Sequence, residues 1–415
     1  MSSLNVRNLA AALLLGSASV ATSVAFIPST VEAAGVRPAI GKPLQQAQAL
    51  AAAGKYPAAL DAVSQAEAVP NKTPAETQII SQMRTYIESK SGDPAVYEKQ
   101  IASGQGNASV ARSLVDAHYR ARQYAKVIGD VDTLRRFGAL DGTTESIVAQ
   151  AYYLQGDYKG AIRFLKATGK TDLDTIKLLY GAAYKSGDTD TLQSTLEQLV
   201  LATGDPEYWR GSIDLADHTH GLTDPETLDL LRLRLATGTM RPGASGDDDY
   251  SLLSQIAIQL KLPGEAQAVM QKGIDAKVVN GNRADRLFNM AKTQAAADSA
   301  GLAAEAAKAN AAPNGDLLVQ LGAQYNGYGR YQDAVTAINA GIAKGVTDKN
   351  NAEMRLGQAY IGLGQRDQAA KAFNAVAKTD DAAYRVAHLW SIYARAGSKA
   401  APADTAAPAG KHHKH

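Results

Sequence analysis

The residue types that most often carry out chemistry are sparse in this chain, and they form no known catalytic motif. There is no cysteine among the 415 residues, which excludes disulfides, thiol catalysis and cysteine-ligated zinc. The chain also lacks the H-E-x-x-H pair of zinc proteases, the G-x-S-x-G turn of serine hydrolases and a phosphate-binding loop after a strand-like run. We therefore predict that the protein is not an enzyme and that it has no catalytic residue, no metal site and no cofactor.

Two groups of histidines are the remaining candidates for metal binding. His218 and His220 are two residues apart, so a helix would place them on different faces, and we interpret them as turn residues rather than a loop metal site. The chain ends in KHHKH, for which three roles stay open: a solvated tail, a weak transition-metal site through neutral imidazoles, and contact with an anionic envelope surface. The last role would strengthen as the histidines protonate below about pH 6.5.

Charge and composition narrow the class of partner. The formal net charge is +2, from 43 basic and 41 acidic residues, so the electrostatic footprint of a nucleic-acid-binding protein is missing. Hydrophobic residues make up 45% of the chain, which is enough for a core, but much of this fraction is alanine. Eighteen tyrosines, against 5 Phe and 2 Trp, carry most of the aromatic area. Small alanine contacts suit helices that approach one another closely.

The N-terminus has the pattern of an export signal. One Arg precedes an uncharged, mostly apolar stretch over residues 9–27, and STVEAAG supplies a small-residue cleavage site. We predict a signal peptide over residues 1–33, cleaved after Ala33, and a periplasmic mature protein with no transmembrane segment. The alternative is an uncleaved anchor, because the apolar stretch is just long enough to span a bilayer. Its small and polar residues favour cleavage.

A short pattern, Gly-x-Tyr-x-x-Ala, occurs at Gly54, Gly156 and Gly329. Tyr56 and Tyr158 are 102 residues apart, which is three times 34, and Tyr331 follows after about five further periods. A helix-breaking turn followed by an amphipathic helix at a fixed period indicates a stacked array of helical hairpins. The pattern Thr-x-x-Glu at Thr73 and Thr223 predicts a capping box, and hence a helix start, at each position.

Two units near the C-terminus show the full repeat. Their matching positions are 35 residues apart: Leu321, Gly322, Tyr325 and Ala334, then Leu356, Gly357, Tyr360 and Ala369. These units resemble tetratricopeptide repeats, whose 34-residue pattern is a large residue, Leu-Gly, Tyr, a glycine-containing turn, Ala, Phe and Ala. The unit LVDAHYRARQYAKVIGDV fits without a glycine at its turn. A degenerate hairpin is expected over LFNMAKTQAAADSAGLAAEAA, which starts at Leu287.

The resemblance covers residues 40 to 395 and implies an all-α fold, an α-solenoid of about 8–10 stacked hairpins. We expect an N-terminal array over residues 40–237, an irregular linker or break over 238–250 (GTMRPGASGDDDY) and a C-terminal array over 251–397. Residues 398–415 form an Ala/Pro tail with too little apolar surface to fold.

The same resemblance implies a concave groove lined by the first helix of each hairpin. Carried over position by position, the groove contains Asp116, Tyr119, Arg120, Gln150, Tyr153, Tyr184, Lys185, Asn289, Lys292 and Gln358. We predict that these mixed polar and aromatic residues bind a protein or peptide partner in the cell envelope, which makes the protein an interaction scaffold. Two alternatives stay open: a cell-wall enzyme or its regulatory subunit, and a carbohydrate-binding protein that uses tyrosines as stacking platforms.

Overall fold

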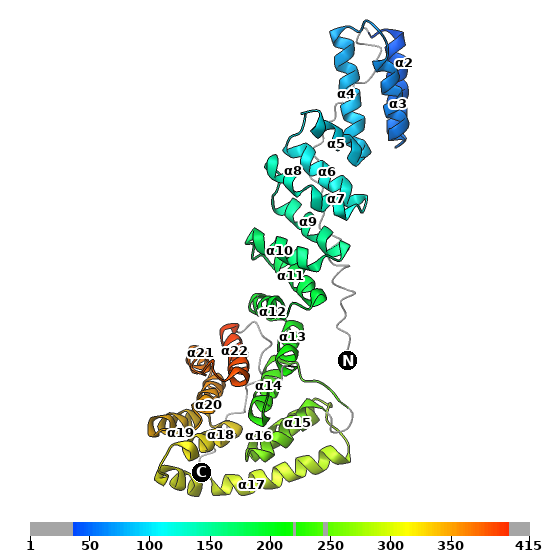
Figure 1. Ribbon diagram of the computed structural model, residues 1–415. Coiled ribbons are helices and arrows are strands. Elements are labelled where there is room, and N and C mark those ends of the chain that lie inside the picture. The colour runs from blue at the N-terminus through cyan, green and yellow to red at the C-terminus, as the bar shows by residue number, and fades with distance from the viewer. Residues whose placement is uncertain (1–35, 219–220, 244–247, 398–415) are drawn as a thin grey trace, which may run out of the picture. The chain divides into compact units, whose positions relative to one another are not determined.

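The computed structural model describes residues 36–218, 221–243 and 248–397, and every regular element in these ranges is a helix (Figure 1). The all-α prediction is therefore confirmed. The predicted signal peptide (1–33) and Ala/Pro tail (398–415) lie outside the described residues. The chain divides into two compact units, residues 1–144 and 145–415. The break predicted at 238–250 falls inside the second unit, between two of its helices, and it stays a prediction.

The first unit consists of short helices that follow one another in chain order. They are α2 (Pro38–Ala52), α3 (Tyr56–Glu67), α4 (Pro74–Ser91), α5 (Pro94–Ala102), α6 (Ala108–Arg120), α7 (Tyr124–Gly129) and α8 (Val131–Arg136). Ile40, Val63 and Ile87 come from α2, α3 and α4 and meet in one core. The capping box predicted at Thr73 is present and begins α4.

The second unit also consists of helices that follow one another in chain order. Its helices are α9 (Gly142–Gln155), whose first residues belong to the first unit, α10 (Tyr158–Thr168), α11 (Leu173–Ser186), α12 (Thr189–Thr203), α13 (Pro206–Asp217), α14 (Asp224–Thr237), α15 (Asp249–Gln259), α16 (Pro263–Asp275), α17 (Asn282–Ala311), α18 (Asp316–Gly327), α19 (Tyr331–Lys344), α20 (Lys349–Gly362), α21 (Arg366–Asn374) and α22 (Asp381–Arg395). The predicted capping box at Thr223 begins α14.

One turn geometry joins most of the hairpins. A residue one or two positions after the first helix has a positive φ, and the next backbone N–H donates to a carbonyl five residues earlier, at 2.8–3.1 Å. This hydrogen bond is the hallmark of the Schellman ending of a helix. The positive-φ residues are Gly54, Arg122, Gly156, Gly187, Lys261, Gly329 and Gly364. The glycines that mark the repeat in the sequence are therefore the residues that end its first helices.

In two of these turns the positive-φ residue is not glycine but Arg122 or Lys261. Their φ angles are +56° and +60°, in the left-handed region that costs a residue with a Cβ about 1–2 kcal/mol. Gln123 and Leu262 nevertheless make the hydrogen bond that closes the turn. The repeat geometry therefore persists where the sequence pattern is interrupted, because helix packing on both sides holds the turn in place.

The unit expected from Leu287 is not a hairpin. Residues Asn282–Ala311 form one continuous helix, α17, of 30 residues. The predicted turn is missing because this segment is rich in alanine, the best helix former, and its single glycine, Gly301, stays inside the helix. This part of the sequence prediction is wrong: alanines at repeat spacing also fit a long helix.

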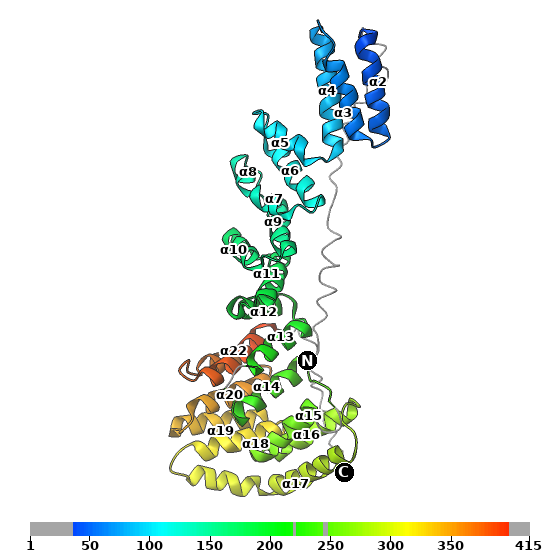
Figure 2. The ribbon, with the colours of Figure 1, turned by 45° about the vertical axis from the view of Figure 1, so that its right-hand side comes forward.

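The second unit turns back on itself at its C-terminal helix. α22 packs against α12, α13 and α14, which precede it by well over a hundred residues (Figures 1 and 2). Trp209 of α13, Leu233 of α14 and Trp390 of α22 belong to one buried cluster. Both tryptophans of the chain therefore lie where the two ends of this array meet.

We predict that Arg122→Gly and Lys261→Gly each raise the free energy of unfolding, by about 0.5–1 kcal/mol. Glycine removes the left-handed penalty of about 1–2 kcal/mol. Part of this gain is offset because glycine raises the conformational entropy of the unfolded chain. Urea unfolding of the full chain measures the change. Arg122→Ala is the control, because it removes the same side chain and keeps the Cβ. A glycine variant no more stable than the alanine variant would contradict the assignment of this turn.

Candidate binding surfaces

The predicted groove residues of the first unit lie together on α6. Asp116 and Arg120 form an exposed ion pair of 2.6 Å, one helical turn apart. The ring of Tyr119 packs edge-on against Tyr124 of α7, with 5.8 Å between the ring centroids. This part of the predicted groove is therefore a polar patch whose charges already compensate each other.

Two predicted tyrosines of the second unit lie on neighbouring first helices, α9 and α11. The ring of Tyr153 faces Gly181, where a Cβ would lie 3.4 Å from Tyr153 Cε2. Tyr184 follows Gly181 by three residues, which places it on the same side of α11. Gly181 thus lies against the Tyr153 ring, which places Tyr153 next to the face of α11 that carries Tyr184.

The two tyrosines differ in exposure. Tyr184 is 42% exposed, whereas Tyr153 is half-buried and packs edge-on against Tyr158, with 5.2 Å between centroids. Leu154, directly after Tyr153, is 52% exposed, and Lys185 beside Tyr184 is exposed. Gln150, one turn before Leu154, is half-buried and donates to Ser146. We call Tyr153, Leu154, Tyr184 and Lys185 the tyrosine face.

Asn289 and Lys292 lie on α17 and are exposed. The neighbouring side chain of Met290 is also 44% exposed. These residues belong to the long helix rather than to a repeat hairpin, so the register that placed them in a groove does not hold for them.

Gln358 lies in an internal polar network rather than on an open surface. Its side-chain nitrogen donates to the Asp229 carboxylate of α14 at 2.8 Å. Its carbonyl oxygen accepts from Arg232 of α14 and from Arg355 of α20, each at 3.1 Å. The amide oxygen and one amide proton therefore take part in joining α20 to α14.

Asp229 is the centre of this network. Its carboxylate accepts from Arg355 at 2.5 Å and from Arg232 at 2.7 Å, and Arg232 also pairs with Glu265 of α16. Trp390 of α22 donates its indole N–H to the Asp229 backbone carbonyl at 3.0 Å. Asp229, Arg355 and Trp390 are each no more than 5% exposed. One buried residue thus connects α14 with α20 and α22.

A second group of ionisable residues surrounds His118 in the first unit. The His118 ring is buried, with Nδ1 2.6 Å from Asp130 and Nε2 3.2 Å from Glu98. Burial raises the pKa of Asp130, whereas the hydrogen bond from Lys126 lowers the pKa of Glu98. Both ring nitrogens have protein partners, so His118 offers no nitrogen to a substrate. The ring instead links α6 to Glu98 of α5 and to Asp130, the residue between α7 and α8.

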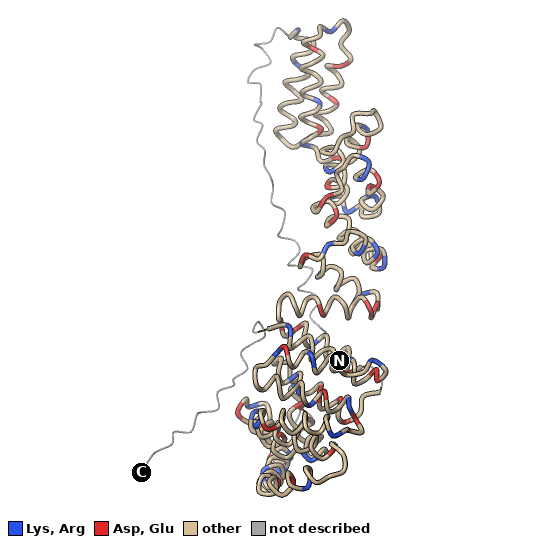
Figure 3. Tube along the Cα trace, turned by 90° about the vertical axis from the view of Figure 1, so that its left-hand side faces the viewer, with Lys and Arg blue, Asp and Glu red and all other residues tan. Residues whose placement is uncertain are grey.

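Within the described ranges, no group of three or more His, Cys, Asp or Glu side chains is placed to hold a metal ion. The helices described there include none that is both long and apolar enough to cross a membrane. Basic and acidic residues are mixed along the described parts of the chain in Figure 3, in keeping with the nearly balanced composition.

The family model of the tetratricopeptide repeat matches residues 354–382. These residues form a tetratricopeptide repeat. The matched segment runs from α20 through α21 to the start of α22, and it includes the unit in which the sequence shows the full pattern. The resemblance stated from Leu356, Gly357, Tyr360 and Ala369 is thereby confirmed.

No curated protein matches the sequence. Among solved structures, the Cut9–Hcn1 hetero-tetramer of the APC/C is 13% identical, with a TM-score of 0.22; the match covers 75% of this chain and 64% of that one, less than two thirds of its length. Yeast Tom70 is 11% identical, with a TM-score of 0.20, and the match covers 85% of this chain and 95% of that one. Both TM-scores lie far below 0.5.

The network around α14 does not follow from the repeat resemblance, although that resemblance led to Gln358. A signal was present in the stretch TLDLLRLRLATG, where leucines occur on all sides of the helix. Leu228, Leu230, Leu231 and Leu233 are all buried. A helix that is apolar all round is enclosed by others, so its charged residues must find partners inside the fold.

We predict that Asp229→Ala lowers the free energy of unfolding of the second unit by about 3–5 kcal/mol, because it leaves two buried guanidinium groups with one carboxylate. Urea unfolding followed by tryptophan fluorescence measures the loss, since both tryptophans lie in the buried cluster beside α14. Asp333→Ala is the control. It breaks the surface ion pair between Asp333 and Arg330, whose side chains are both about half exposed. The loss of this pair should cost no more than about 1 kcal/mol. Equal losses in the two variants would show that the network does not hold the array closed.

Proposed function

We propose that the protein is a non-catalytic scaffold of the periplasm that holds a protein partner of the cell envelope on its tyrosine face. The observation that supports this most directly is the exposure of Tyr184 and Leu154 on neighbouring first helices, α9 and α11. Large apolar side chains that gather on a folded surface are a feature of interaction sites. Tetratricopeptide repeats are protein-interaction modules, and the match at residues 354–382 supports the same class of function.

The chemistry of the tyrosine face suits a peptide or a helix of another protein. Tyrosine supplies a large contact area with few rotatable bonds, and its hydroxyl bonds to backbone or polar groups of a partner. Leu154 adds an apolar contact, and Lys185 adds a positive charge at the edge. We expect an extended segment or a helix whose apolar side chains alternate with polar or acidic ones.

The rest of the predicted groove contributes less to this proposal. Gln358 is engaged by Asp229, and Asp116 and Arg120 neutralise each other. Asn289 and Lys292 belong to α17, which is not a hairpin. Among the ten predicted residues, Tyr153, Tyr184 and Lys185 are therefore the ones we assign to partner binding.

We predict that Tyr184→Ala weakens partner binding by roughly 30-fold, the equivalent of about 2 kcal/mol at a tyrosine hot spot, and leaves helicity and thermal stability unchanged. A photo-crosslinking amino acid at residue 184 would first identify the partner in an envelope extract, and titration of the purified partner would then give the affinity. Tyr86→Ala is a matched control, because Tyr86 of α4 is 43% exposed and lies in the other unit.

Unlike Tyr184, Tyr153 also packs inside the array. It contacts Tyr158 and the cluster with Ala161 and Ala182, so Tyr153→Ala should lower stability as well as binding. Tyr184 is therefore the decisive position. Unchanged affinity in a normally folded Tyr184→Ala variant would remove the tyrosine face from the mechanism. Retention of a glycan without any protein would instead favour a carbohydrate-binding function.

The periplasmic location rests on the N-terminal sequence alone. We predict that the mature protein begins at Ala34 and is recovered in the soluble periplasmic fraction, because small residues precede the expected cleavage point after Ala33. Intact-mass measurement of the exported protein decides the point. Full-length mass in a membrane fraction would show an uncleaved anchor, and full-length mass in the cytosol would contradict export.

A further inference from the structure

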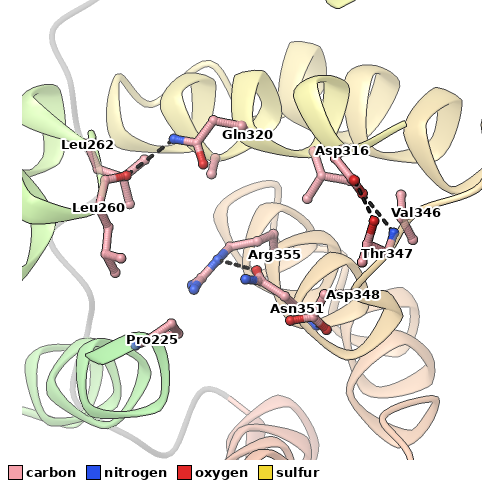
Figure 4. Close-up of a pocket in the computed structure, with 12 residues that line it drawn as sticks. Pro225, Leu260, Leu262, Asp316, Gln320, Val346, Thr347, Asp348, Asn351 and Arg355 are labelled. Carbon is pink, nitrogen blue, oxygen red and sulfur yellow. Dashed lines mark hydrogen bonds between the residues drawn. The ribbon is translucent and has the colours of Figure 1, made fainter. Parts of the chain in front are cut away.

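The second unit contains a cavity of about 210 Å³ that the repeat pattern does not foresee (Figure 4). It lies between the start of α14, the turn that joins α15 to α16, helix α18 and the first two turns of α20. The apolar residues Leu260, Leu262 and Val319 are part of its lining. Arg355 of α20 points into the space. The cavity shares no residue with the tyrosine face, and what it binds does not depend on the function proposed above.

Arg355 keeps unused hydrogen-bond donors inside this cavity. Its Nε donates to Asn351 Oδ1 at 3.1 Å, and its Nη1 donates to Asp229 and Gln358. No described residue accepts a hydrogen bond from Nη2, although the side chain is only 5% exposed. A guanidinium presents its donors in a fixed plane, so the Nη2 protons are directed at whatever fills the cavity.

The two buried guanidinium groups of the network differ in how well they are neutralised. Burial by itself would lower the pKa of Arg232, but Glu265 and Asp229 raise it above its ordinary value. Burial lowers the pKa of Arg355 and the nearby positive charge of Arg232 lowers it further, so that Asp229 offsets only part of the effect. Arg355 is therefore the buried cation with the less complete set of partners, and an anionic group in the cavity would complete it.

Asn351 adds a second donor beside Arg355. Its Oδ1 accepts from Arg355, which fixes the orientation of the amide and leaves Nδ2 as the free end. Asn351 and Arg355 are four residues apart on one face of α20, and both line the cavity. Two donors on adjacent turns, one of them charged, form a receptor for a carboxylate.

One further charge lies on the same helix face. Asp348, at the N-cap of α20, accepts from the Asn351 backbone through Oδ1, and no described residue donates to its Oδ2. Because Arg355 reaches back to Asn351, its guanidinium lies about one helical turn, roughly 5 Å, from the level of Asp348. Asp316, the other carboxylate at the rim, is already occupied by Thr347 and Asn314. Asp348 is therefore the lining carboxylate with an oxygen that accepts from no described residue, and we assign it to a cation bound next to the ligand carboxylate.

We infer that this cavity binds a free α-amino acid with an aliphatic side chain, of about the size of leucine. Its carboxylate accepts from Arg355 Nη2 and Asn351 Nδ2, its ammonium group donates to Asp348, and its side chain packs against Leu260, Leu262 and Val319. The short separation between the opposite charges selects an α-amino acid over one whose amino group is distant. The small volume excludes most larger ligands, since sites for drug-sized molecules begin near 300 Å³.

Titration calorimetry on the full chain tests this inference with three probes: L-leucine, N-acetyl-L-leucine and 4-methylpentanoate. Leucine should bind saturably. The other two lack the ammonium group and should bind at least 10-fold more weakly, because a hydrogen bond to a charged group accounts for about 10- to 100-fold in affinity. Equal binding of leucine and N-acetyl-leucine would assign the cavity to the C-terminus of a peptide and overturn the inference. The absence of saturation by leucine at 10 mM, roughly the weak limit for a small ligand, would overturn it too.

Two substitutions separate the charges without removing structural contacts. Asp348→Asn keeps an N-cap residue but loses the negative charge, so leucine should bind at least 10-fold more weakly while 4-methylpentanoate is unaffected. Asn351→Asp keeps the acceptor for Arg355 Nε and places a negative charge where the ligand carboxylate lies, so it should weaken both. Asp380→Asn at the N-cap of α22 is the matched control and should change neither affinity. Leucine affinity that is unchanged in both cavity variants would overturn the inference.

Discussion

The second unit depends on the burial of one charged residue, Asp229. Its carboxylate is shared by Arg232, Arg355 and Gln358, and its backbone carbonyl accepts from Trp390. A buried charge is tolerated only when it is paired and hydrogen-bonded, and loss of a partner leaves the others uncompensated in a medium of low dielectric constant. Because Arg355 and Gln358 come from α20 and Trp390 comes from α22, the network is satisfied in one arrangement of the array, with its last helix against α13 and α14.

The packing of α22 against α13 and α14 leaves some helices of the second unit enclosed and others with exposed apolar side chains. Helix α14 is enclosed: Leu230 and Leu233 face the cluster around Trp390, and Leu228 and Leu231 face the cluster with Leu253. The cavity beside Arg355 lies at the start of this enclosed helix, where Pro225 is part of its lining. In α9 and α11, by contrast, Tyr184 and Leu154 remain exposed, and this difference is why we place protein binding there.

The hairpins show how far the local pattern extends. Glycine at the positive-φ position and alanine where helices touch are properties of short segments, and they identify the turns at Gly54, Gly156, Gly329 and Gly364 correctly. Arg122 and Lys261 show that packing maintains the same turn at an energetic cost. In α17 the pattern fails, because alanines at repeat spacing do not distinguish a hairpin from a continuous helix without a strong breaker between them.

The sequence by itself determined the helical class, the repeat, most turns and the two capping boxes, because each depends on residues within a few positions of one another. It also led to Tyr153 and Tyr184, since repeat register specifies which side of a first helix a residue occupies. Only the tertiary structure decided that Gln358 binds Asp229, 129 residues away, and that both tryptophans lie where the array closes. Pairing at such separation follows from the accumulated angle between many stacked helices, and no short segment of sequence encodes that sum.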